Sequence, residues 1–166
     1  MKIFILGAAG TGKTTLATRI SKKTHIEATN LDDIFWSNEK DSFGVKRDKT
    51  ERDMLYEAIL QKESWIIEGA YVEWPKQGFY RADEVVYLDV GRFEINKRII
   101  RRFVLRKLHF EASIKTETIS GLINLIKWNN KQIVEMKLLM DKLKLEGLKI
   151  IELYNSMDVE KYVESI

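Results

Sequence analysis

Residues near the start of the sequence combine glycine, lysine and hydroxyl side chains in a pattern that binds phosphate. The run GAAGTGKT, residues 7–14, satisfies G-x-x-x-x-G-K-[ST] and directly follows an apolar stretch. Glycines let backbone N–H groups turn inward to form an anion-binding nest, and the positive end of a following helix strengthens its field. Lys13 would reach the β- and γ-phosphates of a nucleoside triphosphate, and the Thr14 hydroxyl would bind Mg²⁺. The sequence therefore predicts a site for ATP with Mg²⁺ on this phosphate-binding loop (P-loop). The loop residues expected to contact the nucleotide are Gly7, Ala8, Ala9, Gly10, Thr11, Gly12, Lys13, Thr14 and Thr15.

Two alternatives compete with this interpretation of the loop. A dinucleotide site requires G-x-G-x-x-G, and the residue three after Gly12 is Thr15, so that pattern is not met. A glycine-rich turn without a ligand would need neither the strand that precedes the loop nor the helix that follows it. The surrounding sequence indicates both, which favours nucleotide binding.

Acidic residues at strand ends bear on the fate of the phosphate. The stretch SWIIEG ends a strand at Glu68, and EVVYLDV carries Asp89 near its end. Hydrolytic P-loop proteins commonly have an acid pair at such a position to orient water, and neither stretch supplies one. Glu68 is expected near the metal, directly or through water, because ligands of α/β sheets bind at the carboxyl ends of strands. A strand-terminal capping acid is the alternative for Glu68.

A cluster of cations is the second feature that points to phosphate chemistry. Its members lie three, four and eight positions apart on a helical stretch and so share a face, and they are Arg98, Arg101, Arg102, Arg106 and Lys107. Such a cluster repels itself without an anionic partner. We expect a short helical arginine lid around residues 92–115, with Arg98 and Arg102 neutralising charge on a transferring phosphoryl group. A solvated helix face or a nucleic-acid contact is the alternative.

The elements that must position these residues alternate along the chain. Short apolar runs alternate with helical patterns, which is typical of a parallel sheet covered on both faces. The expected strands are residues 2–6, 25–29, 64–68, 84–90 and 148–153, and the expected helices are 13–23, 47–62, 93–108, about 116–145 and 158–166. The predicted fold is a three-layer α/β P-loop NTPase fold, a five-stranded parallel sheet within a single domain over residues 1–166.

Two helices carry specific packing expectations. In the helix over 47–62, the side chains expected to face inward are Met54, Leu55, Ile59 and Leu60. The long helix over 116–145 has an apolar stripe at spacings of three and four, formed by Ile119, Leu122, Ile126, Ile133, Met136, Met140 and Leu143. Asn129 interrupts this stripe. The stripe indicates core packing, with the seam of a homodimer as the alternative.

Composition excludes several other classes of protein. The 166 residues include no cysteine, so disulfides and thiolate metal sites are excluded, and the two histidines, His25 and His109, lack metal-ligand spacing. No apolar run approaches the roughly 20 residues that span a bilayer, and a cytoplasmic protein without membrane contact is expected. A net charge of +3 is too mild to indicate nucleic-acid binding by itself.

Five segments in the same order resemble those of a known family. They are GAAGTGKTTLA, LDDIFW (31–36), WIIEGAY (65–71), RADEVVYLDV (81–90) and INKRIIRR (95–102). The chain resembles the small P-loop kinases of the adenylate kinase and shikimate kinase type, and within them the bacterial DNA topology modulation proteins. The resemblance implies transfer of the γ-phosphoryl group of ATP to a nucleoside, nucleotide or other small hydroxyl compound.

The resemblance also implies an acceptor site. Asp32 would bind or deprotonate the acceptor hydroxyl, with Asp33 as the alternative for that role and helix N-capping as the alternative for both. The other residues expected at the acceptor are Trp36, Arg47, Glu68, Tyr71 and Arg81. Phe35 and Trp36 would form a wall of the acceptor pocket or simply pack against their neighbours. Arg47 and Arg52 would hold an acceptor phosphate or remain surface cations. Adenine would approach the loop after the last strand, residues 155–157, with Asn155 as the expected contact.

The chain departs from these families at several positions. Glu68 stands where they usually have Asp, Ala70 stands where the topology modulation proteins usually have Asn, and Glu73-Trp74-Pro75-Lys76 lacks the arginine of adenylate kinases. AMP is therefore not the expected acceptor. Two functions remain as alternatives to a kinase: a nucleotide-dependent switch or slow NTPase, and a nucleic-acid binder that uses the basic helix. A monomer or a homodimer is expected.

Overall fold

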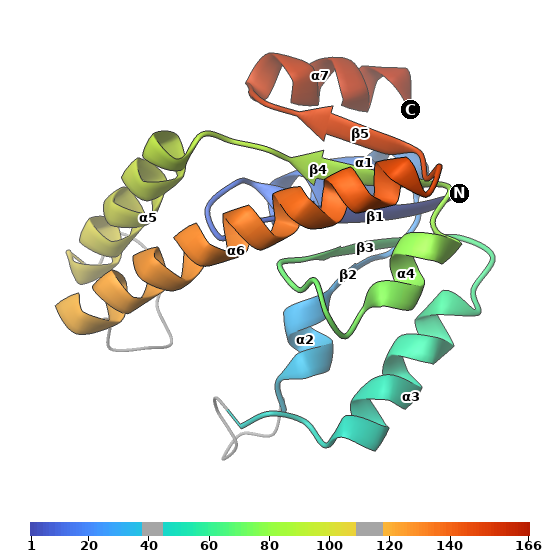
Figure 1. Ribbon diagram of the computed structural model, residues 1–166, viewed down its shortest axis with the longest axis horizontal. Helices are drawn as coiled ribbons and strands as arrows, with labels where there is room; N and C mark the ends of the chain where they lie inside the picture. Colours follow the sequence, from blue (N-terminus) through green and yellow to red (C-terminus); the bar gives the residue numbers. More distant parts are fainter. Residues whose placement is uncertain (38–44, 109–117) are drawn as a thin grey trace.

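A computed structural model describes residues 1–37, 45–108 and 118–166 (Figure 1). Its centre is a sheet of five parallel strands in the order β2-β3-β1-β4-β5. The strands are β1 (Lys2–Gly7), β2 (Ala28–Asn30), β3 (Trp65–Gly69), β4 (Glu84–Leu88) and β5 (Ile150–Leu153). The predicted α/β architecture with a five-stranded parallel sheet is confirmed.

The sheet is buried on both faces, as its continuous apolar runs predict. One face packs in a cluster that contains Phe4, Trp65 and Phe79, and the other in a cluster that contains Ile5, Leu16 and Ile66. Residues Ile3–Leu6 of the central strand are fully buried. Because β1 leads directly into the P-loop, this rigid strand fixes where the loop begins.

The helices are placed close to their predicted positions. They are α1 (Lys13–Thr24), α2 (Leu31–Phe35), α3 (Lys49–Leu60), α4 (Lys76–Arg81), α5 (Arg92–Lys107), α6 (Ile119–Leu145) and α7 (Ser156–Ser165). The short helices α2 and α4 are additions to the predicted set. Side chains of Asn30, Asp48, Thr118 and Asn155 accept N–H groups at the starts of α2, α3, α6 and α7, which fixes the residue at which each helix begins. None of the described helices combines the length and the hydrophobicity that a bilayer crossing requires.

The inward face predicted for α3 is partly wrong. Met54 and Leu55 are 69% and 41% exposed, whereas Tyr56 and Leu60 are buried. The reason is that α3 packs through a narrow contact with α4: the Tyr56 hydroxyl donates to the Pro75 carbonyl at 2.8 Å. A side chain at Gly78 would meet that hydroxyl at 2.0 Å, so the close approach requires glycine there.

Helix α6 divides into two parts. Its C-terminal half packs into the core through Ile133, Met136, Met140 and Leu143, which confirms the core-packing interpretation of that part of the stripe. Its N-terminal half continues past the sheet beside α5, and Ile119 is 68% exposed (Figure 1). Asn129 lies between the two parts and is fully buried. Residues 109–115 of the predicted lid lie outside the described residues.

Candidate active site

The P-loop connects β1 to α1 and is folded tightly on itself. Gly10 and Gly12 have φ angles of 85° and 102°, in the left-handed region that favours glycine. The hydroxyl of Thr11 donates to the Ala8 carbonyl at 2.9 Å, and the Nζ of Lys13 donates to the same carbonyl at 3.2 Å. Gly12 has no side chain with which to cap the first N–H groups of α1, so these donors remain for an anion.

Lys13 is the cation at the base of this loop. Burial lowers the pKa of its ammonium group, and the nearby carboxylates of Glu68 and Asp32 oppose that effect. A bound triphosphate would favour the charged form further, because it brings negative charge to the same place. Lys13 is therefore suited to a ligand that carries several negative charges.

Glu68 and Thr14 bring a carboxylate and a hydroxyl together beside the P-loop, and oxygen groups of this kind are the donors that Mg²⁺ accepts. The Thr14 hydroxyl donates to Oε1 of Glu68 at 2.7 Å, and Glu68 is 3% exposed at the end of β3. Burial raises the pKa of Glu68, while the hydrogen bond from Thr14 and the charge of Lys13 hold it down. The described residues contain no group of three or more His, Cys, Asp or Glu side chains placed to hold a metal ion.

Two cavities open against the P-loop and share Gly12 and Thr15 in their linings. The carboxylate cavity, of about 470 Å³, is lined by Ala9, Gly10, Gly12, Lys13, Thr14, Thr15, Asn30, Asp32, Glu68, Gly69, Ala70, Tyr71, Arg102, Leu125 and Trp128. The β5 cavity, of about 270 Å³, is lined by Thr11, Gly12, Thr15, Leu16, Arg19, Leu88, Val90, Arg98, Leu153, Asn155, Ser156, Val159 and Glu160. The loop thus lies between two chambers, and the smaller one combines apolar side chains with Arg19, Arg98 and Glu160.

Asp32 enters the carboxylate cavity from the first turn of α2. The hydroxyl of Tyr71 donates to its Oδ1 at 2.7 Å, and Tyr71 stacks on Phe35 with ring centroids 4.9 Å apart. Burial and the Asp32 carboxylate both raise the pKa of Tyr71, so Tyr71 remains a donor. The N-capping alternative is wrong, because Asn30 caps α2. Asp33 is exposed and is absent from the lining, which leaves Asp32 as the carboxylate of α2 in the cavity.

Helix α5 contributes one arginine to each cavity. Arg102 lines the carboxylate cavity and Arg98 lines the β5 cavity. Arg98 also donates to the Thr11 carbonyl at 3.3 Å and pairs with Glu94 at 3.0 Å. Arg101, by contrast, lines neither cavity. The spacing of four residues places Arg98 and Arg102 one turn apart along the helix, on the two sides of the P-loop.

The β5 cavity includes the residue predicted to lie near adenine. Asn155 follows β5 and lines this cavity. Its side chain accepts the N–H groups of Met157 and Asp158 at 2.8 and 3.1 Å. Asn155 therefore fixes the first turn of α7 at the cavity wall.

Three residues expected at the acceptor are not brought into the carboxylate cavity. Arg47 donates to the carbonyls of Ile34 and Trp36 at 2.9 and 3.2 Å, and it pairs with Glu51. The guanidinium of Arg47 therefore hydrogen-bonds to carbonyls at the C-terminal end of α2, which lack helical partners.

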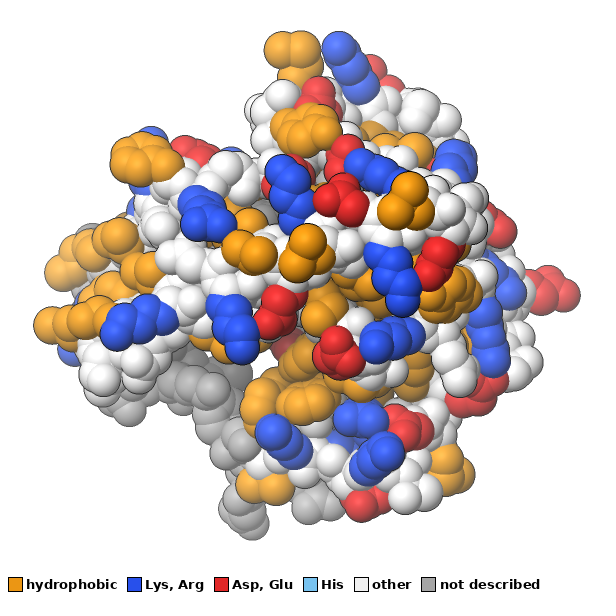
Figure 2. Space-filling model, in the orientation of Figure 1, with side chains coloured by type: hydrophobic (Ala, Val, Ile, Leu, Met, Phe, Trp, Pro, Cys, Tyr) orange, Lys and Arg blue, Asp and Glu red, His pale blue; other side chains and the backbone are white. Residues whose placement is uncertain are grey.

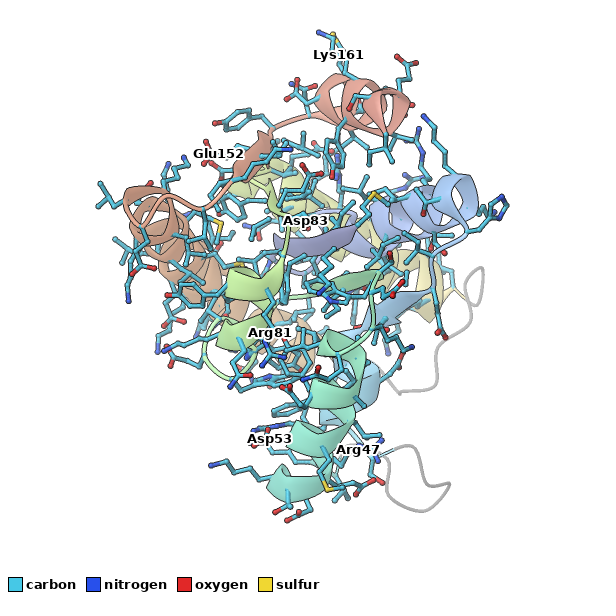
Figure 3. All side chains as sticks on the ribbon, turned by 90° about the vertical axis from the view of Figure 1, so that its right-hand side faces the viewer. Arg47, Asp53, Arg81, Asp83, Glu152 and Lys161 are labelled. Atoms are coloured by element: carbon cyan, nitrogen blue, oxygen red, sulfur yellow. The ribbon has the colours of Figure 1, made fainter. Side chains whose placement is uncertain are left out.

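Arg81 and Trp36 have other partners as well. Arg81 pairs with Glu57 at 2.7 Å, across the contact of α4 with α3. Figure 3 shows Arg47 near the start of α3 and Arg81 on α4, well apart from each other. The Trp36 ring meets Phe35 edge-on. Neither Arg81 nor Trp36 lines either cavity.

Helix α6 supplies site residues that the sequence did not reveal. Leu125 and Trp128 line the carboxylate cavity, and the side chain of Asn129 bonds to the P-loop. The available signal was the interruption of the apolar stripe, because a polar residue on a buried face needs hydrogen-bond partners. The sequence could not identify those partners.

Comparisons with known proteins support the fold. No family model matches the chain. It is 37% identical over 87 residues to the uncharacterized protein YqaC of Bacillus subtilis (strain 168), a match that covers 52% of this chain and 47% of YqaC. The chain thus spans about half the length of that curated relative. The structure of shikimate kinase from Bacteroides thetaiotaomicron superposes with a TM-score of 0.57 at 17% identity, over 99% of this chain and 95% of that chain. The chain therefore shares the α/β fold of that P-loop kinase.

Proposed function

We propose that the protein is a kinase that transfers the γ-phosphoryl group of Mg²⁺–ATP to the hydroxyl of a small acceptor. The observation that carries the proposal is the content of the carboxylate cavity: Asp32, oriented by Tyr71, shares one chamber with Lys13 and Arg102. Phosphoryl transfer needs a base for the acceptor and cations for the phosphate, and this chamber has both. A nucleotide switch would have no use for the oriented carboxylate.

The proposed reaction assigns a task to each of these side chains. Asp32 accepts the proton of the acceptor hydroxyl as that oxygen bonds to the γ-phosphorus, and the bond from the γ-phosphorus to the oxygen of the ADP leaving group breaks. Lys13 and Arg102 neutralise charge on the phosphoryl oxygens during transfer. Thr14 and Glu68 would hold Mg²⁺, directly or through water. When bound, Mg²⁺ supplies further neutralisation of the β- and γ-phosphates.

The β5 cavity is the proposed site of the donor base. Its walls include the apolar side chains of Leu88, Val90, Leu153 and Val159, which suit the faces of a purine ring. Arg98 lines this cavity and donates to the Thr11 carbonyl. The α- and β-phosphates of the donor would pass beside this arginine.

The charge of the carboxylate cavity favours an acceptor without a phosphate of its own. Among the described residues of its lining, the cations are Lys13 and Arg102, and both are assigned to the donor phosphates. Arg47 and Arg81, the residues expected to hold an acceptor phosphate, are committed elsewhere. Tyr71, Leu125 and Trp128 offer apolar surface for a ring. A nucleoside or a similar neutral hydroxyl compound therefore fits better than a nucleotide.

The face in Figure 2 bears on the nucleic-acid alternative. Lys and Arg side chains there are interspersed with Asp and Glu side chains, so this face presents no extended surface of one sign. Binding to the phosphate backbone draws on clustered cations. This face therefore gives no support to nucleic-acid binding.

An acceptor panel tests the proposal. Purified protein with Mg²⁺–ATP should form ADP faster with at least one neutral hydroxyl compound than without an acceptor, and mass spectrometry should show the phosphorylated product. Nucleosides, their 5′-monophosphates, sugars and hydroxy acids form the panel. The proposal fails if every acceptor leaves ADP formation at its background rate while ATP binds normally.

A further inference from the structure

A fully buried amide on α6 holds the backbone of the P-loop. The Oδ1 of Asn129 accepts the N–H of Ala9 at 2.8 Å, and its Nδ2 donates to the carbonyl of the same residue at 3.1 Å. Asn129 is 0% exposed, and 120 positions separate it from Ala9 in the chain. A carboxamide can accept and donate at once, so it matches both polar groups of one peptide residue.

Burial of the Asn129 amide on an apolar helix face costs free energy unless the amide is hydrogen-bonded. Asn129 lies between Ile126 and Ile133 on the face of α6 that packs against the core. A buried polar side chain on such a face is tolerated only when it is hydrogen-bonded, whereas leucine would continue the apolar stripe. The two hydrogen bonds to Ala9 satisfy Asn129, but they do not explain why a polar residue is there. A role in the P-loop does.

The next residue of the loop, Gly10, is in close contact with α5. A side chain at Gly10 would meet Cγ1 of Ile99 at 3.2 Å and the carbonyl of Ile95 at 3.5 Å, so α5 lies directly against this glycine. Ala9 and Gly10 are therefore held by the two helices that pack on each other, α6 and α5. Both residues line the carboxylate cavity, where the γ-phosphate would be transferred.

We propose that Asn129 is a positioning residue: it sets the orientation of the Ala9 peptide groups, and through them the shape of the P-loop that receives the triphosphate. It also fixes α6 to the loop at the point where α6 passes from the core to its contact with α5. The effect on nucleotide affinity requires only the nucleotide site, whereas the effect on turnover rests on the proposed kinase function. Misplacement of reacting groups by about 1 Å costs on the order of 100-fold in rate.

Two substitutions separate this role from core packing. Asn129→Leu restores an apolar side chain but leaves the N–H and carbonyl of Ala9 without their partner, so the two effects oppose each other and the melting temperature should change little. Asn129→Asp keeps the shape of the side chain but replaces the donor with a carboxylate oxygen that faces the Ala9 carbonyl. Asn130→Ala is the matched control, because Asn130 is the next residue of α6 and its Oδ1 has no hydrogen-bond partner among the described residues.

Three readouts are measured on each variant. Calorimetry with Mg²⁺–ATP and no acceptor should show affinity about 10-fold weaker for Asn129→Leu, as expected when about 1.4 kcal/mol of interaction is lost. The turnover number should fall more than the affinity, toward 100-fold, if a misplaced γ-phosphate is the cause. Hydrogen exchange followed by NMR should show faster exchange of the Ala9 amide. Asn130→Ala should change none of these.

The outcomes decide between the two roles. If Asn129→Leu is stable and binds and turns over ATP like the unchanged protein, Asn129 is only a satisfied core residue and the proposal is overturned. If Asn129→Leu does not fold, Asn129→Asp decides by the same readouts. If no acceptor is ever phosphorylated but the variants still lose ATP affinity and Ala9 protection, the proposed kinase function fails and the role of Asn129 stands.

Discussion

Within the P-loop, Thr11 and Lys13 donate to the Ala8 carbonyl three and five positions away, whereas the chamber beside the loop is held by bonds that span much of the chain. Thr14 and Glu68 are 54 positions apart, and Asp32 and Tyr71 are 39 apart. The turn of the first region is specified by one short motif, and long-range hydrogen bonds with Asn129 and Arg98 hold that turn in place. The second exists only after β2, β3, α5 and α6 have come together. A change in the loop should therefore act alike on every ligand, and a change in the chamber should act on the acceptor step alone.

Substitution of Lys13 by methionine should have the largest effect. Lys13→Met removes the cation from the P-loop, and turnover should fall on the order of 1,000-fold or more, with weaker ATP binding. The empty protein should be at least as stable as before, because a desolvated charge is removed. Kinetics and thermal melts check both, with Lys22→Met as the control on the exposed part of α1.

The same substitution has a pH signature. Burial lowers the pKa of Lys13 below the ordinary value of 10.5, so between the two values the unfolded chain binds more protons than the folded one. The stability of the empty protein should therefore rise with pH in that window. Lys13→Met should remove this rise. A variant with the same pH dependence as the unchanged protein would contradict the assigned environment of Lys13.

Asp32→Asn should separate the chamber from the loop. The amide keeps the size of the side chain but cannot take the acceptor proton, so turnover should fall about 100- to 1,000-fold, within the usual contribution of a general base. Affinity for ATP should be nearly unchanged. Asp33→Asn is the matched control, since Asp33 is adjacent and exposed. Equal losses in both variants, or a loss of ATP affinity in Asp32→Asn, would place Asp32 outside the proposed role.

Whether a feature of the fold or the site can be predicted from the sequence depends on how far apart in the chain its contacting residues lie. The buried strands follow from apolar runs such as residues 2–6, and the loop follows from its glycines, because both signals lie within a few neighbouring residues. The contact of Asn129 with Ala9 could not be predicted, because nothing local to residue 129 names a partner 120 positions away.

Arginines illustrate the same limit more sharply. Arg98 and Arg102 were placed at the phosphates from their helical spacing, and both line the cavities beside the loop. The family resemblance predicts Arg47 and Arg81 at the acceptor. In the structure, Arg47 donates to the Ile34 carbonyl and Arg81 pairs with Glu57. An arginine binds any well-placed oxygen, so its partner is decided by tertiary structure and cannot be inferred from its type.

Tyr71→Phe should have an intermediate effect. It removes the hydroxyl that donates to Asp32 but leaves the ring stacked on Phe35. Hydrogen bonds to charged groups contribute about 1.5–3 kcal/mol, so turnover should drop roughly 10-fold or somewhat more. In the background of Asp32→Asn the same change should have little further effect, because the two residues act as a unit. Additive losses in the double variant would show that Tyr71 does not act through Asp32. Tyr80→Phe, on an exposed tyrosine that bonds to Glu146, is the control.

Arg47→Ala should have the smallest effect on catalysis, and it tests the boundary of the chamber most directly. The guanidinium of Arg47 donates to the carbonyls of Ile34 and Trp36, so its loss should lower the free energy of unfolding by about 2 kcal/mol. Below the melting temperature, the KM for the acceptor should stay within about twofold, because nothing in the cavity lining is removed. Arg47→Lys should recover little of the stability, since an ammonium group cannot serve several carbonyls as the planar fork does. A large rise in the acceptor KM with unchanged stability would reverse the assignment: Arg47 would then leave α2 when the acceptor binds, and an anionic acceptor would be the better candidate.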